Sequence, residues 1–174
     1  MVASGPNPAA FSWAYNDALQ PYPYDPAKAR ELVKAAGAEG ATLTFCVTEG
    51  GSGMLDPVLM GTAIQADLKA IGLNVKIETY EWNTFLGKVN PGLEGKANMA
   101  KMAWMTNDPD TLPFLALHTS AWPDQGGFNS GYSSNPQVDE LLEQARVSTS
   151  QTVLAVLYKE IQRIVYEDTP WVFV

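Results

Sequence analysis

Apolar positions recur along the chain with two periods, one typical of helices and one of strands. Residues 24–37 carry a helical stripe in which Asp25 can cap the helix, Pro26 suits its first position and Gly37 ends it. Residues 41–47 and 73–80 alternate apolar and polar positions as strands do, and residues 54–72 between them are helical in pattern. These segments predict a β-α-β unit with parallel strands.

The remaining pattern predicts helices over 81–89, 111–118, 135–147 and 151–166, strands over 99–104 and 171–174, and a glycine-rich loop over 119–134. We therefore expect an α/β fold with an open, mostly parallel or mixed sheet and helices on both faces. Ligands of such sheets bind beyond the carboxyl ends of the strands. The loops after the strands are thus the expected place of a site.

Composition narrows the function classes. The 174 residues carry a net charge of −8 with scattered basic residues, which disfavours a nucleic-acid partner. No run is long enough for a membrane helix, and the stretch "MVASGPNPAAF" has neither the basic region nor the apolar core expected of a secretion signal. Cys46 is the single cysteine and lies in an apolar alternation, so we expect a small buried residue rather than a disulfide.

Chemistry has few candidates in this chain. Asp108 and Asp110 flank Pro109 without the glutamate of a calcium loop, so a turn that caps the next helix is favoured over a metal site. His118 is the only histidine, no G-x-S-x-G elbow occurs, and a structural role for it is favoured. One histidine and one cysteine cannot make a zinc site. We expect neither metal, cofactor nor catalytic residues.

Two glycine-rich or aromatic features remain. The stretch "EGGSGM" (49–54) lacks the phosphate-loop lysine, and a flexible connection is favoured over an anion site. Trp82 follows one predicted strand and Trp104 ends another, so both rings lie at one edge of the sheet if those strands are neighbours. They are either the walls of a pocket for a mixed apolar and polar ligand or half-buried core residues.

Several segments, taken in order, resemble the family 5 extracellular solute-binding proteins, which are the peptide, oligopeptide and nickel receptors of ABC importers. The matching segments are "YPYDPAKARELVKAAG", "IQADLKAIGLNVKIETYEWNTFL", W-x-x-N-D-P-D, "GYSSNPQVDELLEQAR" and "LYKEIQRIVYEDTPWVFV". The resemblance covers residues 22–174 and implies a single ligand-binding lobe there, equivalent to the second lobe of a longer two-lobed protein, after an extended segment over 1–21.

The resemblance also implies a ligand site. Peptide-binding relatives use residues that match Trp82, Leu86, Lys101 and Trp104. They place an aspartate, which pairs with the amino terminus of a peptide, where this chain has Asn107; Asp108 is adjacent and is an alternative anchor. An amide is a weaker partner than a carboxylate for an ammonium group. The resemblance therefore leaves two ligand classes open, a short peptide and an oligosaccharide or opine-like solute.

The implied function is capture of a solute in a cleft for a membrane permease, at the periplasmic or extracellular face of the cell membrane, without chemistry. A different class of protein would be an α/β hydrolase or metal-dependent enzyme, which needs Asp108, Asp110 and His118 to converge. A third class is a protein interaction domain, whose sign would be a large exposed apolar patch without a cleft.

Overall fold

The computed structural model describes residues 3–51 and 53–173. Contacts divide the chain into two compact units. The sheet unit is Pro23–Met105, and the helical unit comprises the residues up to Tyr22 together with those from Thr106 onward. The sequence predicts an extended segment over 1–21 followed by one ligand-binding lobe over 22–174, and this organisation stays a prediction.

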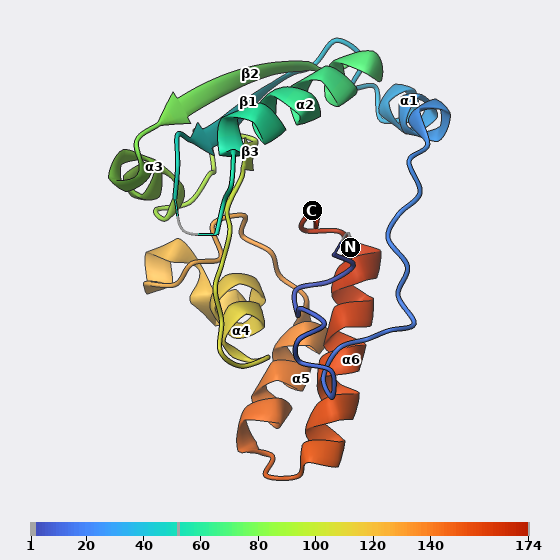
Figure 1. Ribbon diagram of the computed structural model, residues 1–174, viewed down its shortest axis with the longest axis vertical. Coiled ribbons are helices and arrows are strands. Elements are labelled where there is room, and N and C mark those ends of the chain that lie inside the picture. Colours follow the sequence, from blue (N-terminus) through green and yellow to red (C-terminus); the bar gives the residue numbers. More distant parts are fainter. Residues whose placement is uncertain (1–2, 52, 174) are drawn as a thin grey trace. The chain divides into compact units, whose positions relative to one another are not determined.

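The sheet unit consists of three parallel strands and three helices. In chain order its elements are α1 (Pro26–Ala35), β1 (Thr42–Thr48), α2 (Pro57–Ala70), β2 (Asn74–Tyr80), α3 (Trp82–Val89) and β3 (Met99–Ala100) (Figure 1). The strand order is β2-β1-β3, and β1 pairs with β2 from Thr42↔Asn74 to Thr48↔Tyr80. The predicted parallel β-α-β unit is confirmed, with β1 in the centre.

Aspartates begin the first two helices. The side chain of Asp25 accepts a hydrogen bond from the backbone N–H of Lys28 at 2.9 Å, and Asp56 accepts one from that of Leu59 at 2.9 Å. Each is followed by proline in the first turn, which suits a position without an intrahelical N–H partner. The predicted cap at Asp25 is confirmed. The apolar stripe of α1 is not buried, however, and Leu32 is 58% exposed.

Side chains of β1 alternate between two helices. On one face, Val47 contacts α2, where a Cβ on Gly61 would lie 3.0 Å from its Cγ2 atom. On the other face, Cys46 packs with Phe85 of α3. Cys46 is 5% exposed, as expected for a small buried residue. The predicted helices on both faces of the sheet are therefore confirmed within this unit.

The third strand is shorter than predicted. Only Met99–Ala100 of the expected strand 99–104 pairs with β1, and the backbone N–H of Lys101 donates to the Cys46 carbonyl at 3.1 Å as the last such bond. A strand at the edge of a sheet has one neighbour to hold it, so an apolar run can leave the ladder early. Trp104 thus lies four residues beyond β3 rather than at its end.

The helical unit is built on α4 (Thr111–Leu117), α5 (Pro136–Val147) and α6 (Gln151–Asp168), with short 3₁₀ turns η1 (Thr119–Ala121) and η2 (Pro123–Gln125). Asn135 caps α5 by accepting from the N–H groups of Gln137 at 2.9 Å and Val138 at 3.3 Å. The segment before residue 22 runs beside α6 (Figure 1), where the Gln162 side chain donates to the Ala14 carbonyl at 2.7 Å. The core residues of this unit are Ala14, Leu117, Val138, Leu142, Ala145, Leu157, Tyr158, Ile161, Ile164 and Val165.

The predicted strand over 171–174 is wrong for its described part. Residues 171–173 form no strand; instead Trp171 and Phe173 pack against the helical core, and residue 174 lies outside the described residues. Aromatic and β-branched residues favour strands, but this segment begins three residues after α6 ends at Asp168, with Thr169 as the helix cap. The described residues of the helical unit contain no strand with which it could pair. In the described part of the chain, no helix is long and apolar enough to cross a membrane.

Candidate ligand-binding site

Trp82 stands at the carboxyl end of β2, where the sequence places it. Glu81 begins α3 directly after the strand, because its carboxylate accepts from the N–H groups of Asn83 at 2.9 Å and Thr84 at 3.2 Å. Trp82 is therefore in the first turn of α3 and half-buried. Its position beyond a parallel strand is where α/β sheets bind ligands.

The Trp82 indole is packed against the core of the sheet unit. Its ring stacks with that of Phe85 at a centroid distance of 5.9 Å and an interplanar angle of 17°. Leu86 packs against the same cluster, whose buried members are Cys46, Phe85 and Val89. Trp82 and Leu86 are thus partly core residues, and each still has some exposed surface.

The loop after β1 meets the segments that follow both neighbouring strands. Gly51 lies against Trp82, and Gly53 lies against Ala103, since a Cβ built on either glycine would come within 3.3 Å of that neighbour. The carboxyl ends of the three strands therefore form one continuous edge, as the parallel topology requires. The sequence does not single out these glycines as site residues, although their clustering after a strand was a usable signal.

Lys101 and Trp104 lie on the segment after β3. Burial lowers the pKa of the Lys101 ammonium group below its ordinary value, and the nearby carboxylate of Asp56 opposes this shift. Trp104 is half-buried, and Met105 at the end of the unit is 75% exposed. The sheet unit therefore contains four of the six predicted ligand-binding residues.

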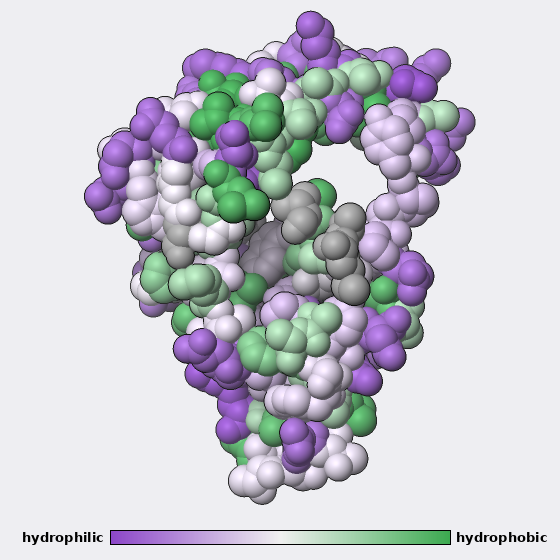
Figure 2. Space-filling model, in the orientation of Figure 1, coloured by the Kyte–Doolittle hydropathy of each residue, from purple (hydrophilic) through white to green (hydrophobic). Residues whose placement is uncertain are grey.

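The amino-terminal end of α2 carries an exposed apolar patch. Figure 2 shows hydrophobic side chains gathered over this end of the helix. The exposed residues there are Leu55, Val58, Leu59 and Met60. The protein interaction domain, whose sign is a large exposed apolar patch without a cleft, stays a prediction.

Asn107 and Asp108 open the helical unit. Asn107 is exposed, whereas the Asp108 carboxylate accepts three hydrogen bonds, from the N–H of Asp110 at 2.9 Å and from the N–H and hydroxyl of Thr111 at 2.8 and 2.6 Å. Desolvation raises the pKa of Asp108, but these hydrogen bonds outweigh it and the pKa lies below its ordinary value. The predicted turn before the next helix is confirmed: Asp108 accepts from the N–H of Thr111, the first residue of α4, whereas the N-cap residue Asp110 makes no side-chain cap bond.

The Asp110 side chain contacts residues of α5 and α6. Its carboxylate lies 3.1 Å from Nε of Arg146 on α5, and the Tyr158 hydroxyl on α6 donates to it at 3.4 Å. The Arg146 guanidinium also lies 3.7 Å from the centroid of the Phe114 ring. Desolvation raises the pKa of Asp110, and Arg146 opposes the shift. This carboxylate joins three helices of the unit.

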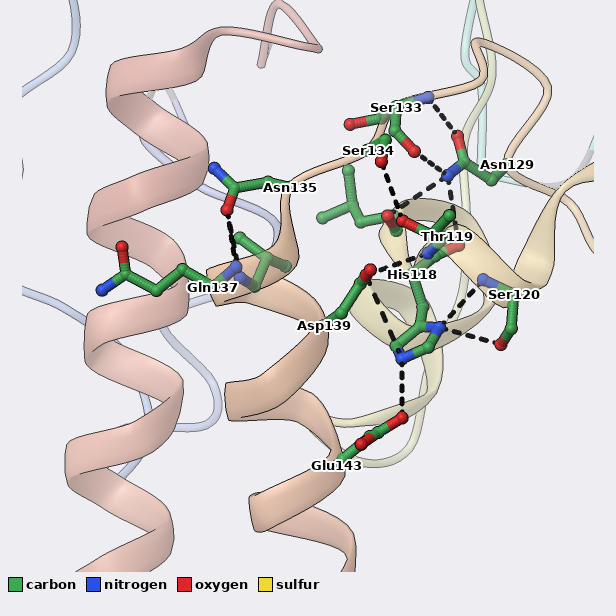
Figure 3. Close-up of polar contacts among 12 residues, drawn as sticks. His118, Thr119, Ser120, Asn129, Ser133, Ser134, Asn135, Gln137, Asp139 and Glu143 are labelled. Carbon is green, nitrogen blue, oxygen red and sulfur yellow. Dashed lines mark hydrogen bonds and ion pairs between the residues drawn. The ribbon is translucent and has the colours of Figure 1, made fainter.

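His118 is a buried link between η1 and α5 (Figure 3). Its Nδ1 accepts from the backbone N–H of Ser120 at 3.0 Å, and because that group only donates, the neutral ring carries its proton on Nε2. Nε2 faces the carboxylates of Asp139 and Glu143, at 4.0 and 3.6 Å. With Nε2 protonated, the imidazole has no lone pair to offer a metal on that side. His118 is buried and held by Ser120, and the structural role favoured for it stays a prediction.

The side chains of the three groups required by an enzyme form no hydrogen bond or ion pair with one another. Asp108 bonds to its own turn, and Asp110 bonds to Arg146 and Tyr158. His118 accepts from Ser120, and its Nε2 faces the carboxylates of α5 without a hydrogen bond to them. Among residues 3–51 and 53–173, no three histidine, cysteine or acidic side chains are grouped to hold a metal ion. These three side chains therefore do not form a paired acid and base around a reacting atom.

Three comparisons bear on the family of the chain. A family model described as "Bacterial extracellular solute-binding proteins, family 5 Middle" matches residues 1–126. Di/tripeptide-binding protein 2 of Pseudomonas aeruginosa is 31% identical over 170 residues, which cover 97% of this chain and 31% of that protein. Heme-binding protein A of Haemophilus influenzae is 32% identical over 164 residues, which cover 92% of this chain and 29% of that protein.

A solved structure has the same fold. The ABC transporter-associated periplasmic binding protein DppA from Helicobacter pylori, in complex with the peptide STSA, is 32% identical with a TM-score of 0.85, over 99% of this chain and 33% of that chain. The predicted fold class is thereby confirmed. The chain spans about a third of the length of the relatives it matches.

Proposed function

This chain belongs to family 5 of the bacterial extracellular solute-binding proteins, and on that premise we propose that it supplies one wall of a solute-binding site of an ABC importer. The proposed cargo is a short peptide or a related solute. Capture takes place without chemistry, because the family binds solutes and the acidic groups and His118 serve the packing of the helical unit.

The observation that carries the proposal is the edge formed by the carboxyl ends of the three parallel strands. We assign ligand contact there to Trp82 and Leu86 after β2, and to Lys101 and Trp104 after β3. Indole rings offer large, rigid surfaces to apolar or planar groups of a ligand. The partly buried ammonium group of Lys101 suits a carboxylate or carbonyl oxygen of the ligand.

Asn107 and Asp108 decide the ligand class within this proposal. The Asp108 carboxylate accepts three hydrogen bonds within its own turn, whereas the exposed Asn107 carries an uncharged amide. A neutral polar group of the ligand suits Asn107 better than an ammonium group does. This observation favours, as a second candidate, an oligosaccharide or opine-like solute over a peptide with a free amino terminus.

Partners and location follow from the family premise. We propose delivery to a membrane permease at the periplasmic or extracellular face of the cell membrane. A solute that binds both walls of a cleft stabilises the closed arrangement, which is the form that a permease can distinguish from the empty one. No cofactor is proposed.

Isothermal titration calorimetry with defined probes tests the proposal. The probes are the tetrapeptide STSA, the same peptide with an acetylated amino terminus, and cellotriose. If either peptide binds and Trp104→Ala weakens this binding, the result supports a peptide site. If the acetylated peptide binds more tightly than the free one, Asn107 is assigned to the uncharged amino-terminal end of the ligand. Binding of cellotriose alone selects the sugar alternative. A Trp104→Ala protein with unchanged affinity for the bound probe would place Trp104 in the core and contradict the assigned wall.

A further inference from the structure

The glycines after β1 do more than connect two elements. The sequence favours a flexible connection for residues 49–54, yet two glycines of this stretch lie in close contact with segments that carry proposed ligand-binding residues. Gly51 contacts Trp82 itself, and Gly53 contacts Ala103, the residue before Trp104. Both contacts lie within the sheet unit.

The Gly51 contact leaves no room for a side chain. A Cβ at this position would lie 2.6 Å from Cε3 and 2.7 Å from Cζ3 of Trp82, distances at which something has to move. The backbone of Gly51 therefore rests directly on the six-membered ring of the indole. The ring is also stacked with Phe85. The Trp82 indole is therefore held by two contacts, one with the backbone of Gly51 and one with the core residue Phe85.

The Gly53 contact combines space with backbone conformation. Gly53 has a φ of +77°, in the left-handed region that favours glycine, and a Cβ there would lie 3.3 Å from the Cβ of Ala103. A side chain at this position would press on the segment after β3. That segment continues directly into Trp104.

The strand order explains why one loop reaches both segments. β1 lies between β2 and β3, so the chain leaving β1 emerges between the chain leaving β2 and the chain leaving β3. The N–H of Glu49, the first residue after β1, still donates to the Tyr80 carbonyl of β2 at 2.8 Å. Gly51 and Gly53 follow within four residues and make the two contacts.

We propose that Gly51 and Gly53 are positioning residues for the ligand-binding wall: Gly51 sets the place of the Trp82 indole, and Gly53 sets the path of the segment that carries Trp104. The inference rests on the proposed function, since it gives these tryptophans their role. The contacts themselves can be tested without any ligand.

Fluorine NMR of the protein labelled with fluorotryptophan tests Gly51, with the resonance of Trp82 identified by its loss in Trp82→Phe. Gly51→Ala is expected to shift the Trp82 resonance. Gly50→Ala is the matched control, because nothing lies within 4 Å of a Cβ on Gly50 and its φ is not positive. An unshifted Trp82 resonance in Gly51→Ala, or an equal shift in both variants, overturns the role of Gly51.

Gly53 has its own control. Gly95 also has a positive φ, +68°, but nothing lies within 4 Å of a Cβ built on it. Gly53→Ala is expected to shift the Trp104 resonance, whereas Gly95→Ala shares the backbone strain and leaves that resonance in place. If Gly53→Ala and Gly95→Ala shift the Trp104 resonance equally, glycine is needed at position 53 only for its positive φ. That result would overturn the positioning role of Gly53.

A rescue variant keeps the Gly51 test decisive if Gly51→Ala folds poorly. Phenylalanine lacks the indole atoms that a Cβ would meet, so Gly51→Ala should lower Tm far less in a Trp82→Phe background. An equal loss in both backgrounds overturns the contact. In the folded variant, affinity for STSA should fall about tenfold or more through displacement of Trp82. A shifted resonance with unchanged STSA affinity leaves the positioning contact standing and contradicts the ligand role of Trp82.

Discussion

Arg146 and Asp110 connect the last turn of α5 to the start of α4 through a 3.1 Å contact between Nε and the carboxylate. The same guanidinium covers the Phe114 ring, whose other neighbour is the stacked imidazole of His118 at a centroid distance of 4.6 Å. One side chain thus holds both a partly buried charge and an aromatic ring of the helical core. Its removal affects both contacts together.

We expect Arg146→Ala to lower the free energy of unfolding by about 1–2 kcal/mol, because it removes a cation–π contact and leaves the Asp110 carboxylate without its cation. Urea denaturation measures the change. Lys28→Ala is the control, since its pair with Glu31 is exposed and such pairs contribute about 0–1 kcal/mol. Equal losses in the two variants would show that the Asp110 contact is an ordinary surface pair.

Asp108 makes the stability of the helical unit depend on pH. Its pKa is lowered in the folded state, so the ionised form contributes stability that is complete above the unfolded pKa of about 3.9 and is lost as pH falls through the lowered folded pKa. Asp108→Asn keeps an acceptor for the Thr111 N–H but does not titrate. Its free energy of unfolding should lie below that of the unmodified protein at neutral pH, and the difference should shrink on acidification. A difference that is constant between about pH 7 and pH 3 would contradict this.

The buried side chain of Asn129 makes hydrogen bonds within the glycine-rich loop and to the residues before it. It is 2% exposed, and its amide donates to the carbonyls of Leu117 and His118, each at 3.2 Å, and of Ser133 at 2.8 Å. We expect Asn129→Ala to cost about 2–3 kcal/mol, because buried carbonyls lose their donor. Thermal unfolding followed by circular dichroism measures it. Ser130→Ala, which removes a single long hydrogen bond of 3.4 Å from the hydroxyl to the Phe128 carbonyl at an exposed place, should leave Tm nearly unchanged.

Cys46 should react slowly with thiol reagents. Burial raises the pKa of its thiol, Glu78 adds to this and Lys88 opposes it, so both access and thiolate content are low in the folded state. The rate of modification by Ellman's reagent is expected to rise sharply in the urea range where the sheet unit unfolds. Fast modification in the absence of urea would contradict the packing of Cys46 against Phe85.

Local signals made much of this fold predictable. Asp25 and Asn135 cap helices because their side chains bond to N–H groups two or three residues ahead, which the sequence alone reveals. The strand extents after residue 98 depend on distant neighbours. Trp104 lies beyond the two residues of β3 that pair with β1, and Trp171 lies in a segment that forms no strand in its described part. Periodicity cannot report whether a partner exists.

In the candidate site, too, some features follow from the local sequence and others depend on residues distant in the chain. Trp82 was predictable, because the end of β2 and the start of α3 are both marked in the sequence. The contacts of Gly51 and Gly53 depend on the order of the strands, which hydrophobic pattern does not encode. The burial of Asp110 against Arg146 and Tyr158 likewise joins residues more than thirty positions apart, so its raised pKa was beyond sequence reasoning.

The central place of β1 also limits how this edge can change over evolution. A residue inserted between Thr48 and Gly53 would move one glycine off its neighbour and put a side chain where only hydrogen fits. We therefore expect related chains with different cargoes to differ by substitutions on α3 and on the segment after β3, while the length of this loop is kept. Engineers seeking a new cargo would do well to diversify those two segments first.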